Sequence, residues 1–190
     1  MARTSVRRRL ALGLGAGSLL VGTLAGPAFA ADTVVQTITG GGLTASIASL
    51  TLASVSYQNA AHDVTGTMVL TADDSRGTSA GWSVTIESSA FVFAGGGTDI
   101  PAANFALTSA QQPTWIAGQL VSSVDSTGPQ IPIEGLAIGT LAGPIKTIRT
   151  TAAYGNGTYS QNLGVTLTIP GQSKIGTYTG TLTTTISATP

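Results

Sequence analysis

Histidine, serine and acidic side chains are the groups through which this chain would catalyse a reaction, and although serine is abundant, histidine and acidic residues are few. His62 is its single histidine. A Ser-His-Asp site needs a serine and an acid beside that histidine. The one G-x-S-x-G spacing, Gly77–Gly81, leads into a predicted strand, whereas the serine of a nucleophile elbow leads into a helix. We interpret His62-Asp63 as a solvated turn between strands. Of the functions that we consider for this chain, a hydrolase is therefore the least supported.

Asp73 and Asp74 are the closest pair of acids. Carboxylates that cleave a glycoside face each other across a sugar at about 5 to 10 Å, whereas adjacent residues of a strand point to opposite faces. The chain has no D-x-D-x-D calcium loop. It also has no cysteine, so a zinc ion would have only His62 and carboxylates as ligands. We predict no enzymatic activity, no bound metal and no cofactor.

Five residues are candidates for ligand binding: Asp74, Arg76, Trp82, Val84 and Trp115. Arg76 would either clamp a ligand or pair with Asp74 through its planar guanidinium, and we favour the pairing. Trp82 and Trp115 are the two tryptophans, whose flat rings suit stacking on sugars. Trp82 alternates with Val84 at the start of a predicted strand, which favours a core position. Trp115 follows a polar stretch and is the better candidate for an exposed binding aromatic.

Threonine and glycine are the dominant residues of the chain. Threonine favours extended segments, and glycine favours the turns between them. We predict an all-β fold, an antiparallel β-sandwich, with an open barrel as the alternative. Pro101 to Pro132 is the least periodic stretch, and we expect long loops there. Asn156-Gly157 suits a tight turn. The predicted strands are Leu43–Leu52, Thr67–Thr71, Trp82–Glu87, Ile145–Thr150, Leu163–Ile169 and Tyr178–Ser187.

The last of these strands has the clearest alternation. A period of two places one set of side chains on the core face and leaves the threonines between them outside. The predicted core set is Tyr178, Gly180, Leu182, Thr184 and Ile186.

The first 30 residues have the composition of a signal peptide. Four arginines precede an apolar stretch, and Ala28-Phe29-Ala30 supplies the small residues of a cleavage site. Cleavage would leave one domain, residues 31–190, with four of the eight basic residues and all eight acids. This acidic excess makes nucleic acid an improbable partner, and no basic amphipathic stretch predicts membrane contact after cleavage.

Several segments together resemble the WxL domain of Gram-positive surface proteins. Asp74–Gly77 and Gly81–Val84 resemble the Asp-x-Arg-Gly stretch and first Trp-x-Leu motif of that family. Gly155–Tyr159, Leu167–Pro170 and Gly176–Leu182 follow in the family's order. The resemblance covers about residues 40 to 190.

The motifs also depart from the family pattern. Val84 replaces the leucine of the first motif, while Thr184 and Ile186 stand where the second motif has its tryptophan and leucine. The resemblance implies a secreted, cell-surface protein that attaches noncovalently to peptidoglycan or another wall polymer, or is displayed with other surface proteins. The alternative is a structural or adhesive module that binds protein partners or self-assembles through exposed strand edges.

Overall fold

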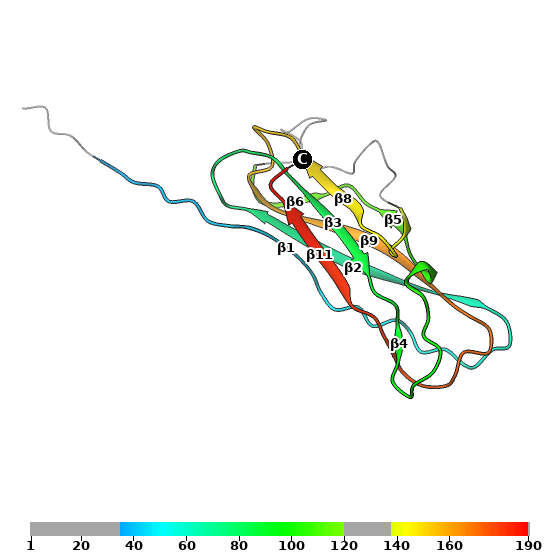
Figure 1. Ribbon diagram of the computed structural model, residues 1–190. Helices are drawn as coiled ribbons and strands as arrows, with labels where there is room; N and C mark the ends of the chain where they lie inside the picture. The colour runs from blue at the N-terminus through cyan, green and yellow to red at the C-terminus, as the bar shows by residue number, and fades with distance from the viewer. Residues whose placement is uncertain (1–34, 120–137, 190) are drawn as a thin grey trace, which may run out of the picture. The chain divides into compact units, whose positions relative to one another are not determined.

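The structure is a computed structural model that describes residues 35–119 and 138–189. Internal contacts divide the chain into two units, residues 1–37 and 38–190. The predicted signal peptide lies outside the described residues. All described strands lie in the second unit (Figure 1): β1 Leu43–Ile47, β2 His62–Asp74, β3 Trp82–Ser88, β4 Val92–Phe93, β5 Phe105–Ala110, β6 Thr114–Gly118, β7 Gly139–Thr140, β8 Ile145–Thr150, β9 Gly157–Ile169, β10 Tyr178–Thr179 and β11 Leu182–Ser187, with one short 3-10 helix, Ala102–Asn104.

The described strands pair only in the antiparallel sense. A large sheet has the order β1-β2-β9-β5-β7, and β6 also pairs with β9. A small sheet has the order β11-β3-β8, and β10 pairs with β4. The all-β antiparallel prediction is confirmed. The two 13-residue strands, β2 and β9, pair along their whole length at the centre of the large sheet.

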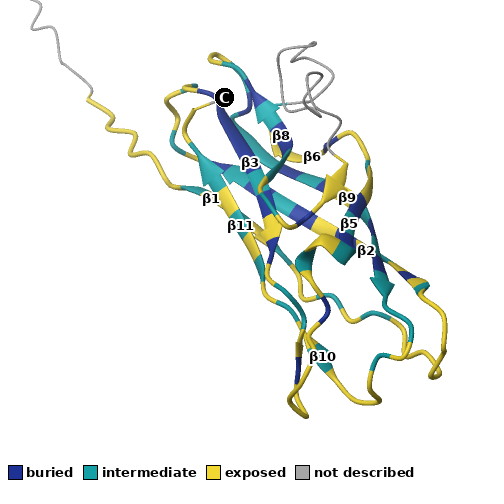
Figure 2. Ribbon diagram, turned by 45° about the vertical axis from the view of Figure 1, so that its right-hand side comes forward, coloured by how far each residue is buried: buried dark blue, intermediate teal, exposed yellow. Residues whose placement is uncertain are grey.

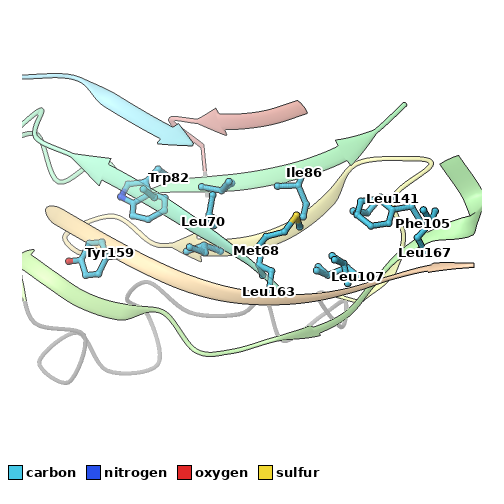
Figure 3. Packing of buried hydrophobic residues seen from close by; sticks show 14 of the residues in the cluster. Met68, Leu70, Trp82, Ile86, Phe105, Leu107, Leu141, Tyr159, Leu163 and Leu167 are labelled. Carbon is cyan, nitrogen blue, oxygen red and sulfur yellow. The ribbon is translucent and has the colours of Figure 1, made fainter. Parts of the chain in front are cut away.

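Side chains of both sheets meet in one hydrophobic core. Trp82, Ile86 and Ile148 come from the small sheet, while Leu70 and Leu163 come from the large one; all five are fully buried. Figure 3 shows these layers facing each other, with Trp82 and Tyr159 at one end of the cluster and Phe105, Leu141 and Leu167 at the other. Burial of this apolar area is the main term that stabilises the fold.

Burial alternates along the strands, as a two-residue period requires. On β2, Met68 and Leu70 are buried, whereas Thr65 and Thr67 are exposed. Figure 2 shows bands of buried and exposed residues along the strands. The predicted register of the last strand is confirmed, because Leu182, Thr184 and Ile186 are partly buried and the threonines between them are exposed. Its first part forms the separate short strand β10.

Two local predictions are wrong, and a third is wrong over the described part of its range. His62 is the first residue of β2 and pairs with Ile169, because the long partner strand β9 extends β2 past the expected turn. The stretch from Pro101 to Pro132 contains β5 and β6, although part of it lies outside the described residues. Gly157 begins β9, which pairs with β2, whereas the preceding strand β8 pairs with β3. Residues 151–156 therefore cross between sheets and do not close a hairpin.

Candidate functional site

Asp74, the last residue of β2, forms an ion pair with Arg76, and we call this pair the Asp74–Arg76 clamp. Arg76 Nε donates to Asp74 Oδ1 and Nη2 donates to Oδ2, each at 2.9 Å, and Nη2 also donates to the Gly81 carbonyl at 3.0 Å. These hydrogen bonds to Asp74 raise the pKa of Arg76 above its usual value. The clamp closes the connection between β2 and β3, since Gly81 immediately precedes Trp82. This geometry agrees with the pairing that we favoured for Arg76.

Trp82 connects β3 to the segment that leads into β9. Its ring is fully buried, and Nε1 donates to the Gly155 carbonyl at 3.0 Å. The ring centroid lies 6.1 Å from that of Tyr159, with the planes tilted by 42°. The Tyr159 hydroxyl in turn donates to the Gln119 carbonyl at 2.6 Å. The tryptophan therefore holds two distant parts of the chain together from inside the domain.

Gly155 is a glycine because no side chain fits at this position. Its φ is +84°, a conformation that side-chain-bearing residues rarely adopt. A Cβ atom would lie 2.8 Å from Thr150 Oγ1 and 2.9 Å from Trp82 Nε1. The hydrogen bond from Trp82 thus depends on a close backbone approach that glycine alone permits.

Tyr159 stays protonated in this environment. Burial raises the pKa of its hydroxyl to about 12, and the nearby negative charge of Asp74 adds to the shift. A phenol that remains neutral can donate a hydrogen bond, which it does to the Gln119 carbonyl. The polar groups at this end of the core therefore hold backbone segments in place.

Four of the five predicted binding residues gather at this end of the domain, and three of them are buried. Trp82 and Val84 have no exposed area, and Asp74 is 1% exposed. A polymer outside the domain cannot touch these three side chains. Arg76 is partly exposed, but its guanidinium is held by Asp74. We call Asp74, Arg76, Trp82, Gly155 and Tyr159 the motif cluster, and its contacts are those of a structural brace.

Trp115 lies on strand β6, where its register partner on β9 is Tyr159 of the motif cluster. All five residues of β6 are exposed, and Trp115 and its neighbour Ile116 are 45% and 52% exposed. Trp115 Nε1 donates to the Gly118 carbonyl at 3.1 Å, which restrains the ring. Within the described residues β6 pairs with β9 alone, so its second edge has no strand beside it. Among the predicted binding residues, Trp115 is the one that offers an open aromatic surface.

The outer face of the large sheet is a polar surface that was not predicted from the sequence. It presents hydroxyl side chains from three neighbouring strands, β1, β2 and β9. The signal was available as the alternation of threonine with apolar residues along β2. We call this surface the hydroxyl face and define it by Ser46, Thr65, Thr67, Thr71, Ser160 and Thr166.

Two further properties of the described residues bear on function. No group of three or more histidine or acidic side chains gathers there in a way that would hold a metal ion. No helix in the same ranges is long and apolar enough to cross a membrane.

Comparison with known proteins identifies a family. A family model described as WxL domain, surface cell wall-binding, matches residues 36–190. Searches of the curated proteins and of the solved structures gave no match. The family match includes every described strand and the whole motif cluster. The chain therefore belongs to the WxL domain family of cell-wall-binding surface domains, and it is a cell-surface protein associated with the cell wall.

Proposed function

We propose that this chain is an exported, noncatalytic module that holds noncovalently to peptidoglycan. The family match over residues 36–190 is the observation that carries the proposal. The geometry supports a binding role, because Trp115 and Ile116 are exposed together on one strand. An aromatic ring of this kind can stack on the apolar face of a sugar.

The titratable groups support the noncatalytic part of the proposal. Asp74 is buried and bound by Arg76, and Asp63 and Asp73 each accept a hydrogen bond from a threonine hydroxyl at 2.6 Å. His62 is partly buried at the end of β2, and its ring nitrogens have no hydrogen-bond partner among the described residues. Catalysis needs a base aligned with a nucleophile or with an orienting acid. None of these groups has such an arrangement in the described parts of the chain.

Sedimentation with purified walls tests the proposal. The full chain, expressed for export, is mixed with isolated Gram-positive peptidoglycan, and the bound fraction is measured against an unrelated secreted β-domain. We expect the parent to sediment with the wall and Trp115→Ala to bind more weakly. Tyr57→Ala is a matched control, because Tyr57 is also an exposed aromatic, at 55%. A parent that does not exceed the unrelated domain would refute the proposed function.

A second candidate function is a structural or adhesive module that binds proteins. It is favoured by β6, whose second edge has no strand beside it among the described residues. An extended segment of another chain can add to such an edge through backbone hydrogen bonds. Light scattering over a range of concentrations tests self-assembly. A mass that stays at one chain, together with firm wall binding, would count against this second function.

A further inference from the structure

The hydroxyl face continues across strands that are far apart in the sequence. Ser46 of β1 lies opposite Thr71 of β2, and Thr71 lies opposite Ser160 of β9. In a second row, Thr65 of β2 lies opposite Thr166 of β9. Directly opposed side chains on a sheet stand about 5 Å apart at Cβ. Between the two rows lie Thr67, whose partner on β9 is Gly164, and Val69, which is 45% exposed.

These hydroxyls are available for a ligand. Within the part of the chain that the structure describes, none of the six has a side-chain hydrogen bond, whereas Thr158 and Thr168 on the same sheet bind Asp73 and Asp63. Ser46, Thr65 and Thr67 are exposed, and the other three are partly buried. Threonine has a stiff χ1 angle, so little side-chain freedom is lost when its hydroxyl binds.

The hydroxyl face carries no basic residue, unlike β8 of the small sheet, which carries Lys146 and Arg149. The four basic residues of the mature chain all lie elsewhere: Arg76 in the motif cluster, Lys146 and Arg149 on β8, and Lys174 in a connection. The carboxylates that share the outer side of the large sheet, Asp63 and Asp73, lie near the two ends of β2. A polyanion would find no cation here and would meet negative charge at both ends.

We propose that the hydroxyl face is a binding surface for an uncharged polysaccharide strand. The inference rests on the proposed function and adds to it a second contact surface, besides the one at Trp115, and the class of polymer. Sugar hydroxyl and amide groups both donate and accept hydrogen bonds, as the threonine hydroxyls do. Neither side carries charge at the contact, so binding avoids the cost of removing a charge from water. Trp115 is not part of this surface, since its register partner is the core residue Tyr159.

The test removes hydroxyl groups without changing side-chain shape. Thr65→Val with Thr67→Val replaces two exposed hydroxyls of the face by methyl groups and keeps the β-branch that favours a strand. Thr183→Val with Thr185→Val is the matched control, because these threonines are exposed on β11 of the other sheet. The full chain carrying each pair is titrated with peptidoglycan from which the anionic polymers have been stripped. Circular dichroism melting shows whether each variant is folded.

We expect the Thr65/Thr67 pair to weaken binding by roughly 30-fold, from the usual net contribution of two hydrogen bonds. The Thr183/Thr185 pair should bind like the parent. Binding by the parent should also change little between low and high salt. A folded Thr65/Thr67 variant with parental affinity, or steep loss of binding in salt, would overturn this inference while the parent's wall binding still supports the proposed function. A parent that does not bind at all would refute both.

Discussion

Replacing Trp82 by phenylalanine should destabilise the domain strongly, although it removes only part of one side chain. Trp82 has no exposed area, and its Nε1 binds the carbonyl of the buried Gly155. The smaller ring cannot donate to that carbonyl, and it leaves space beside Tyr159. Trp115→Phe is the matched change on the surface, because Trp115 is 45% exposed.

The magnitude follows from these two losses. Leaving a buried carbonyl without its donor costs about 1–3 kcal/mol. The space left by the smaller ring adds about 1–2 kcal/mol, if the core relaxes only partly. We therefore expect Trp82→Phe to lower the free energy of unfolding by about 2–5 kcal/mol. For Trp115→Phe we expect a change within about 0.5 kcal/mol.

Equilibrium unfolding in urea, followed by far-ultraviolet circular dichroism, measures both changes. Tryptophan fluorescence is unsuitable, since each variant removes one of the two fluorophores. A folded Trp82→Phe variant with parental stability that no longer binds peptidoglycan would refute the assignment of Trp82 to the core. Equal destabilisation by both variants would contradict the conclusion that Trp82 stabilises the fold while Trp115 does not.

Three further outcomes are expected at the motif cluster. Arg76→Met leaves the buried carboxylate of Asp74 without its partner and should cost about 3–5 kcal/mol in urea unfolding; a loss below about 1 kcal/mol would contradict the clamp. Gly155→Ala should lower the melting temperature far more than Gly96→Ala. Both glycines have positive φ, but an added Cβ atom would meet neighbouring atoms only at Gly155. Similar shifts in melting temperature would show that the loss of stability comes from the backbone conformation and not from the close contact. The raised pKa of Tyr159 means that the folded state favours the neutral phenol, so this contribution to stability is complete below pH 10 and is lost as pH rises through about 12. In pH-dependent unfolding, Tyr159→Phe should lack that loss, and an unchanged slope would refute the assignment.

Strands with regular local alternation could be predicted from the sequence. The pattern of Leu182, Thr184 and Ile186 specifies which face is buried, and the structure has the same register. Trp82 to Glu87 was predicted within one residue of β3 for the same reason. In these segments every second side chain faces the core. The two-residue alternation of apolar and polar residues can therefore be seen in the sequence without knowing which strand is the partner.

Strands that depend on distant partners were missed. β5 has a register shift between Leu107 and Ser109, which interrupts its alternation. β6 has no buried residue, and its pairing with β9 alone defines it. The brace was only partly visible, because the sequence does not show that the Trp82 indole reaches the Gly155 carbonyl. The family resemblance includes both segments, Gly81–Val84 and Gly155–Tyr159, but does not predict that they are in contact.

The pairing of β2 with β9 also sets the order in which this domain can form. Asp74 pairs with Gly157 and His62 with Ile169, so each contact closes a loop that contains β3 to β8. Nonlocal pairing of this kind slows folding, because the chain loses the entropy of a long loop before it gains the contacts. During synthesis β2 has no central partner until β9 has been made. A chain that is truncated before β9 should therefore remain unfolded, and its exposed strands should be prone to aggregation and proteolysis.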